Sequence, residues 1–282
     1  MPLIRTGDLV AAAYRTGTAM LAFNVITLEH AEAIAMGAEA AGSPVIMQIS
    51  ENTVMFHGGR IRPLVAAACA IATESTTSIA VHLDHVEDPE LLRAGIDSGV
   101  SSAMFDASKL PYEDNVAATK AAADLAHARG VFLEAELGEV GGKDGAHAPG
   151  VRTDPDAAAA FVAATGVDAL AVAVGSSHAM ATRTATLDFE LIARLHHALP
   201  VPLVLHGSSG VAEEDLRKAV AAGMTKINVG TMLNAAYTAV VRRQLLADTM
   251  VTDPRRYLGP ARVAVARTVA ETILGVAGTA GA

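Results

Sequence analysis

The sequence is poor in cysteine, in aromatic residues and in long apolar runs. Its 282 residues include one cysteine, no tryptophan and only 4% aromatic residues. A single cysteine cannot form a disulfide within the chain, so the composition does not require an oxidising compartment. Cys69 lies in an alanine-rich run, where we expect it to act as a small buried hydrophobic residue. No charge-free apolar stretch reaches the roughly 18 residues that a membrane-spanning helix needs.

Positive charge is scarce as well. The chain has 21 lysines and arginines against 30 aspartates and glutamates, which gives a net charge of −9. This balance argues against nucleic acid or an anionic membrane as the main partner. Arg5 and Asp8 interrupt the N-terminus before any long apolar run, so we expect no secretory signal peptide. We therefore predict a soluble, cytoplasmic protein with no nucleic-acid or membrane partner.

A regular alternation of two kinds of segment fills most of the chain. Short apolar runs alternate with alanine-rich stretches whose apolar residues recur every three or four positions, as in helices that cover a sheet. Eight such alternations in about 250 residues predict an α/β fold, a single (β/α)8 barrel domain over residues 1–282 with a C-terminal helical extension. An open doubly wound sheet is the alternative, but no glycine-rich dinucleotide fingerprint follows the first strand. The expected strands are 19–25, 44–49, 78–83, 101–105, 131–136, 169–174, 202–205 and 225–229.

One connection differs from the rest. Residues 138–150 contain five glycines and one proline, which excludes a regular helix or strand. Long connections in compact domains often act as lids over an active site, so we expect a mobile loop there. A surface loop without function is the alternative.

Ligand-type side chains follow several of the expected strands. In a barrel, the C-terminal strand ends carry the active site. Asp84 and His85 follow the third apolar run, and strand alternation predicts that they point in opposite directions. His85, His178 and His206 each follow a separate run, and three converging imidazoles predict a Zn²⁺ site with an open position. Further polar residues at these ends are Asn24, Ser50, Asp106, Glu134, Glu136 and Asn228.

Glycine, serine and threonine follow the last two strands, in 205–210 and 228–231. Backbone N–H groups at this place form the usual phosphate site of a barrel. Zinc beside a phosphate site can polarise a ketone and stabilise the enediolate that proton removal leaves. Asp84 could exchange a proton with a substrate hydroxyl, and Asp144 in the long loop could act as a second base. These parts predict reversible carbon–carbon cleavage of a phosphorylated ketose. A metal-dependent hydrolase or isomerase and a non-catalytic phosphosugar-binding protein are the alternatives.

Six motifs in this order resemble the class II, zinc-dependent fructose- and tagatose-bisphosphate aldolases. The resemblance covers almost the whole chain, from Ala22 to Arg255. The motifs are His82-Leu83-Asp84-His85, Met104-Phe105-Asp106-Ala107-Ser108, Glu134-Ala135-Glu136-Leu137-Gly138, Val174-Gly175-Ser176-Ser177-His178, Leu205-His206-Gly207-Ser208-Ser209-Gly210 and Lys226-Ile227-Asn228-Val229.

The resemblance implies an activity in carbohydrate metabolism, specifically glycolysis. Fructose 1,6-bisphosphate or tagatose 1,6-bisphosphate would be cleaved reversibly to dihydroxyacetone phosphate and an aldehyde such as glyceraldehyde 3-phosphate. Asp84 would transfer the proton of the C4 oxygen, and Asp144 would occupy the place of the family's loop glutamate. The enzyme would use one catalytic Zn²⁺, and K⁺ or Na⁺ would lie near the phosphate.

The same resemblance implies roles for the remaining site residues. His85, His178 and His206 would hold the catalytic zinc, and Asp106 and Glu136 match the ligands of a second divalent metal in some members. Arg255 matches an arginine that reaches the distal phosphate from a neighbouring subunit, which implies a homo-oligomer, a dimer or a tetramer. The positions matched to substrate or phosphate contacts are Asn24, Ser50, Gly175, Ala179, Gly207, Ser209, Asn228 and Thr231.

Three positions depart from the family pattern, and one of them is Gly230, where the family often has alanine or aspartate. Asp144 is one methylene shorter than the glutamate it would replace, and Ala179 stands where the family usually has glycine. These departures keep two alternatives open: an aldolase-like enzyme for a non-standard phosphosugar, and a phosphosugar-binding protein without catalysis.

Overall fold

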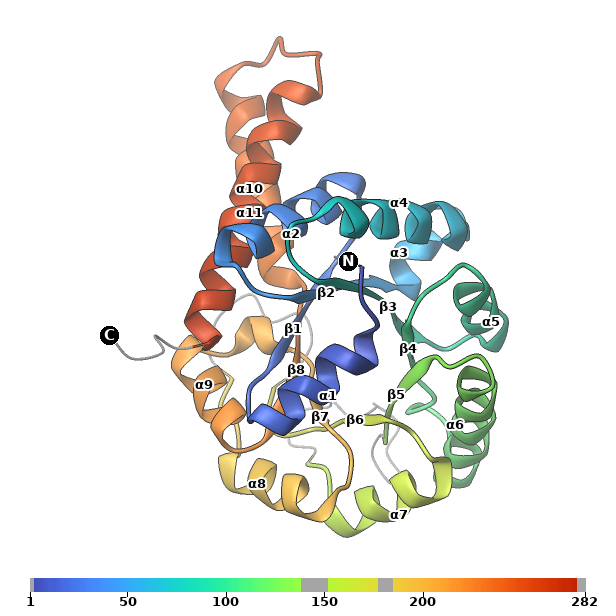
Figure 1. The fold of residues 1–282 in the computed structure, drawn as a ribbon. Helices are drawn as coiled ribbons and strands as arrows, with labels where there is room; N and C mark the ends of the chain where they lie inside the picture. Colours follow the sequence, from blue (N-terminus) through green and yellow to red (C-terminus); the bar gives the residue numbers. More distant parts are fainter. Residues whose placement is uncertain (1–2, 138–151, 177–184, 278–282) are drawn as a thin grey trace.

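The protein folds as a closed barrel of eight parallel strands that pair in chain order, with β1 returning to β8 (Figure 1). The computed structural model describes residues 3–137, 152–176 and 185–277. The predicted α/β barrel and all eight predicted strands are confirmed. The strands are β1 (Met20–Asn24), β2 (Val45–Ser50), β3 (Ile79–Val86), β4 (Ser102–Phe105), β5 (Phe132–Glu136), β6 (Ala169–Ala171), β7 (Leu203–Leu205) and β8 (Met224–Val229).

The eight predicted helices surround this barrel (Figure 1). Alternate strand residues face them: Leu21 and Phe23 of β1 pack in the layer between sheet and helices, whereas Met20 and Ala22 face the barrel interior. Cys69 packs against this outer layer as a small hydrophobic residue, as expected, but it is partly rather than fully buried. The helices are α2 (Leu28–Ala41), α4 (Ile61–Glu74), α5 (Pro89–Asp97), α6 (Tyr112–His127), α7 (Pro155–Thr165), α8 (Phe189–Ala198), α9 (Glu213–Ala221) and α10 (Thr231–Ala247).

A helix that is not among the predicted ones, α1 (Thr6–Thr16), lies across the N-terminal end of the barrel (Figure 1). Its residues Leu9, Val10 and Ala13 pack against inward-facing apolar side chains of the first three strands. Ser102 at the start of β4 donates a hydrogen bond to the Thr6 hydroxyl at 2.7 Å. This helix therefore closes one end of the barrel, and the polar strand ends lie at the other. The other unpredicted elements are the short helix α3 (Glu51–Phe56) and the turn η1 (Ser208–Gly210).

The predicted C-terminal extension is the helix α11 (Arg255–Ala277), which is confirmed. Together with α10 it forms an arm that projects beyond the ring of helices (Figure 1). The base of the arm packs against α2, where Arg262 forms an ion pair with Glu32. Close approach is possible because α2 has Gly37 there: a Cβ at this position would lie 2.5 Å from the Ala266 carbonyl oxygen. Within the ranges given above, no helix is long and apolar enough to cross a membrane.

Candidate active site

The third strand ends differently from the prediction. It continues through Asp84 and His85 to Val86 rather than ending at Leu83, and its pairing with β4 shifts register between Leu83 and Val86. His85 has φ of 49°, the one positive φ of a non-glycine residue in the described ranges. A bulge with a left-handed residue breaks the strict alternation of side chains. Strain of this kind is common at functional sites.

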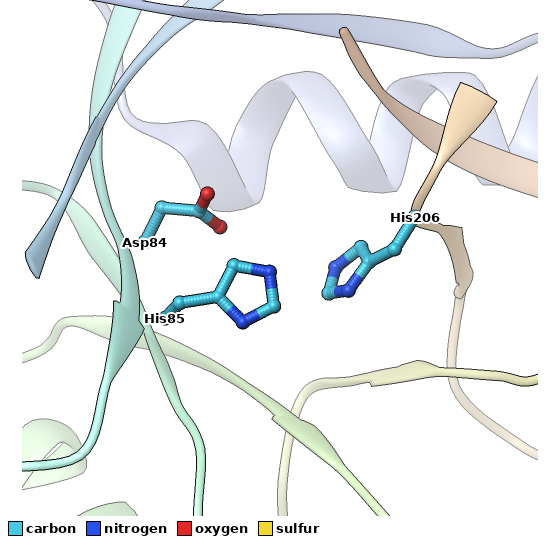
Figure 2. A group of neighbouring side chains, drawn as sticks. All are labelled: Asp84, His85 and His206. Atoms are coloured by element: carbon cyan, nitrogen blue, oxygen red, sulfur yellow. The ribbon is translucent and has the colours of Figure 1, made fainter. Parts of the chain in front are cut away.

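The bulge brings two side chains of β3 to one centre. Asp84, His85 and His206 offer ligand atoms that all lie within 4.8 Å of one another, and Figure 2 shows the three side chains converging. The expectation that Asp84 and His85 point in opposite directions is therefore wrong, because the backbone turns between them. His206 follows β7, and its ring centroid lies 4.7 Å from that of His85. His178, the third predicted zinc ligand, falls outside the described residues.

A second group of potential ligands shares His85 with the first. It consists of His85, Asp106 after β4 and Glu136 at the end of β5. His85 Nδ1 lies 2.9 Å from Asp106 Oδ2, while Ser108 donates to Asp106 Oδ1 through both its backbone N–H and its hydroxyl. Burial alone would raise the pKa of Asp106, but the hydrogen bond and charge of His85 together with the hydrogen bond from Ser108 outweigh it, and the pKa is lowered. Asp106 is thus held ionised, as a metal ligand must be.

Neighbouring carboxylates shift the pKa of His85 upward. Burial would lower the pKa of this imidazole, but the charge of Asp84 and the hydrogen bond to Asp106 raise it. The cluster therefore attracts positive charge. Imidazoles together with carboxylates form a donor set that suits zinc and other divalent metals. The residues present fit the metal site that the sequence predicts.

His206 is fully buried between two carboxylates of β5. Its Nδ1 lies 3.1 Å from Glu136 Oε2 and its Nε2 lies 3.3 Å from Glu134 Oε1. Burial opposes the charged ring, but hydrogen bonds to both glutamates raise the pKa of His206 to about 10. Glu134 also accepts a hydrogen bond from Lys226 Nζ at 2.9 Å. Glu134 and Glu136 are two positions apart on β5, so both face the barrel interior, Glu134 one layer deeper.

Asp84 is buried and is held by two amide side chains. Gln48 Nε2 donates to Asp84 Oδ2 at 3.2 Å, and Asn228 Nδ2 donates to Asp84 Oδ1 at 3.4 Å. Gln48 also donates to Asn24 Oδ1 at 2.5 Å. Gln48 is not among the predicted site residues. A single polar residue inside the apolar run of β2, facing the same interior as the other site residues, was the available signal.

The predicted phosphate site lies after β7 and β8. Gly207 has φ of 69° at the start of η1, and Ser209 Oγ accepts a hydrogen bond from the Met232 N–H in the first turn of α10. Thr231 begins α10, so its N–H points out of a helix N-terminus, where anions bind. Gly175 has φ of 118°, and a Cβ there would lie 2.2 Å from a backbone oxygen, so its place requires glycine. The predicted phosphate site lies next to the potential metal ligands, because Gly207 directly follows His206 and Asn228, which donates to Asp84, comes three residues before Thr231.

Besides His178, four predicted site residues are found in other settings or are not described. Ser50 caps α3 by accepting a hydrogen bond from the Thr53 N–H at 3.2 Å. Arg255 begins α11 at the tip of the arm, where its side chain is 89% exposed and paired with Asp253. Asp144 and Ala179 lie outside the described residues.

Sequence comparisons match the chain to one family of known proteins. Residues 4–282 match the family described as fructose-bisphosphate aldolase class-II. The chain is 40% identical over 273 residues to the probable fructose-bisphosphate aldolase of Bacillus subtilis (strain 168), covering 95% of each chain. It is 38% identical over 273 residues to the fructose-bisphosphate aldolase of Geobacillus stearothermophilus, again covering 95% of each.

Solved structures give the same result. The YdjI aldolase from Escherichia coli K12 matches with a TM-score of 0.83 and 31% identity, covering 99% of this chain and 98% of that one. A putative fructose-1,6-biphosphate aldolase from Coccidioides immitis matches with a TM-score of 0.83 and 30% identity, covering 96% of each chain. The chain therefore belongs to the class II fructose-bisphosphate aldolase family, and it is an enzyme of the aldolase type, a lyase.

Proposed function

We propose that this protein is a divalent-metal-dependent aldolase, with zinc as the metal, that cleaves a ketose bisphosphate reversibly. Fructose 1,6-bisphosphate and tagatose 1,6-bisphosphate are the substrates we propose, with dihydroxyacetone phosphate and glyceraldehyde 3-phosphate as products. The observation that carries the proposal is the convergence of Asp84, His85 and His206 within 4.8 Å at the C-terminal end of the barrel. Cytoplasmic action in carbohydrate metabolism is part of the proposal.

Asp84 is the residue we assign to the proton of the C4 hydroxyl. Its carboxylate lies within 4.8 Å of the ligand atoms of His85 and His206 and is oriented by Gln48 and Asn228. When Asp84 takes this proton, the C4 oxygen becomes the aldehyde, the C3–C4 bond breaks and its electron pair stays with C3. Protonation at C3 then completes dihydroxyacetone phosphate, and we assign that step to Asp144 of the long loop.

His85 and His206 would hold the metal together with His178, while Asp106 and Glu136 would hold a second or displaced divalent ion. A bound divalent metal would polarise the ketone carbonyl and stabilise the negative charge that cleavage leaves on the carbon skeleton. The turn at Gly207, Ser209 and the start of α10 would bind the 1-phosphate, with K⁺ or Na⁺ nearby.

A homo-oligomer, a dimer or a tetramer, is proposed because the arm places Arg255 far from its own barrel opening. The arm also exposes large apolar side chains where α10 ends: Leu246 is 77% exposed and Met250 is 83% exposed. Apolar surface of this kind often marks a contact with another protein. Arg255 of one subunit would then serve the distal phosphate in another.

The test is a substrate screen on chelator-treated protein with and without added Zn²⁺. We expect zinc-dependent release of dihydroxyacetone phosphate from one of the two bisphosphates, and loss of cleavage in Asp84→Ala with metal binding kept. Full activity of protein shown to contain no metal would overturn the metal-dependent mechanism.

A second measurement separates catalysis from ligand binding. If the protein is an aldolase, we expect it to exchange a proton of dihydroxyacetone phosphate with solvent. We expect this exchange to be suppressed in Asp144→Ala. Binding of the phosphosugar without any exchange would instead identify the non-catalytic alternative.

A further inference from the structure

The buried ion pair of Lys226 and Glu134 lies one layer deeper in the barrel than the metal-ligand cluster. This cluster consists of the potential ligands Asp84, His85, Asp106, Glu136 and His206. Lys226 Nζ is 2.9 Å from Glu134 Oε2, and both side chains are fully buried. Neither residue belongs to the groups of described residues that could hold a metal. Desolvating two charges is costly, and such a pair is weak evidence for stability by itself. The contacts of the pair therefore point to a role other than stability.

Only one oxygen of Glu134 is needed for Lys226. The other, Oε1, lies 3.3 Å from His206 Nε2, while the Nδ1 of the same ring lies 3.1 Å from Glu136 Oε2. Glu136 shares a potential metal group with His85 and Asp106, so Nδ1 of His206 is the ring nitrogen that lies beside a potential metal ligand. Nε2 is the ring nitrogen beside Glu134, which belongs to neither of these groups. The two edges of one imidazole are thus assigned to two different neighbours.

We propose that Glu134 and Lys226 are positioning residues that select the metal-binding edge of His206. Lys226 fixes the Glu134 carboxylate, which accepts a hydrogen bond from the His206 Nε2–H and so leaves Nδ1 to hold the metal. A neutral imidazole carries its proton on one nitrogen, and the partner of that nitrogen decides which one binds the metal. This inference rests on the metal site proposed above.

Replacement of Glu134 by glutamine gives a specific test because an amide has one accepting and one donating end. In Glu134→Gln, the Lys226 ammonium retains the amide oxygen, so the amide NH₂ faces His206 Nε2. Nε2 must then accept, which places the proton on Nδ1 and blocks the metal. In the double variant Glu134→Gln/Lys226→Met the amide is released from the lysine and turns its oxygen to Nε2–H. The second substitution should therefore restore what the first removes.

The experiment measures metal affinity of chelator-treated protein by competition between the protein and a chromophoric chelator for Zn²⁺, and records the visible spectrum with Co²⁺. We expect Glu134→Gln to bind Zn²⁺ about 10–100-fold more weakly, the usual effect of losing such a partner, and to alter the Co²⁺ spectrum. The double variant should recover most of the affinity. Thr165→Val, which removes a buried hydrogen bond in α7, is the matched control and should bind as the wild type does.

Each outcome decides the matter. Wild-type affinity in Glu134→Gln, or a double variant that binds no better than Glu134→Gln, overturns the inference and leaves the metal site intact. If Glu134→Gln does not fold, Glu134→Asp decides: it keeps a carboxylate for Lys226 but withdraws the acceptor from His206, so unchanged affinity overturns the inference. A wild-type protein that binds no divalent metal overturns the proposed function itself.

Discussion

Replacing Gln48 by leucine tests whether the amide side chains around Asp84 matter for catalysis. The substitution keeps the approximate size of the side chain and removes the donor to Asp84 Oδ2. It also removes a buried acceptor, Gln48 Oε1, that has no partner among the described residues. Two hydrogen bonds, to Asn24 and to the buried Asp84 carboxylate, are lost while one unsatisfied acceptor disappears, so we expect the free energy of unfolding to fall by about 1–3 kcal/mol.

The expected kinetic effect follows from the two distances at Asp84. Hydrogen bonds to charged groups contribute about 1.5–3 kcal/mol. The bonds from Gln48 and Asn228 measure 3.2 and 3.4 Å, longer than the usual 2.9–3.0 Å, so the lower part of that range applies. A loss of about 1.5–2 kcal/mol corresponds to about a 10–30-fold fall in kcat. KM should change little if Gln48 acts through Asp84.

The assay is steady-state cleavage of the preferred bisphosphate with metal saturating. Thr53→Val is the matched control, since it removes a neighbouring buried hydrogen bond, to the Val25 carbonyl, without touching Asp84. We expect the control to keep wild-type kcat. Unchanged kcat in Gln48→Leu would refute the orienting role, and a rise in KM alone would assign Gln48 to substrate contact instead.

Three further predictions follow from other parts of the chain. Gly37→Ala places a Cβ 2.5 Å from the Ala266 carbonyl oxygen and should lower the free energy of unfolding, measured with urea, by about 1–3 kcal/mol. Gly259→Ala, with open space around it, should instead raise it by up to about 1 kcal/mol. Equal effects of the two substitutions would contradict the packing of α11 on α2. Burial lowers the pKa of His82 from 6.5 to about 3, so below pH 6.5 the unfolded chain takes up a proton that the folded one does not. The free energy of unfolding of the metal-free protein should therefore fall by about 1.5–2 kcal/mol between about pH 6.5 and 5. A His82→Gln variant whose free energy of unfolding has the same pH dependence would exclude this residue as the cause. Arg255→Ala should raise KM for the 1,6-bisphosphate much more than for the ketose 1-phosphate, and equal rises would contradict a contact with the distal phosphate.

Local sequence patterns account for most of the fold. The strand runs, the helical periodicity and the glycines that end helices, such as Gly42 and Gly166, are short-range signals, and all eight strands and their covering helices lie where these signals place them. The helix α1 was missed because its environment is a tertiary one: its apolar face packs into the barrel end rather than onto the outside of the sheet. The position of the active site at the C-terminal strand ends also follows from the fold class.

The sequence motifs name the candidate site residues, whereas the tertiary structure decides how the described ones are arranged. The motif at residues 82–85 predicts a ligand and an acid–base group, yet ideal alternation would separate them. Only the bulge against β4, with His85 at φ 49°, turns Asp84 and His85 to one centre. The bond of Gln48 to Asp84 and the pairing of Glu134 with Lys226 join residues 36 and 92 positions apart. Such contacts follow from closure of the barrel, which brings distant strands around one interior, and no periodicity in the chain encodes them.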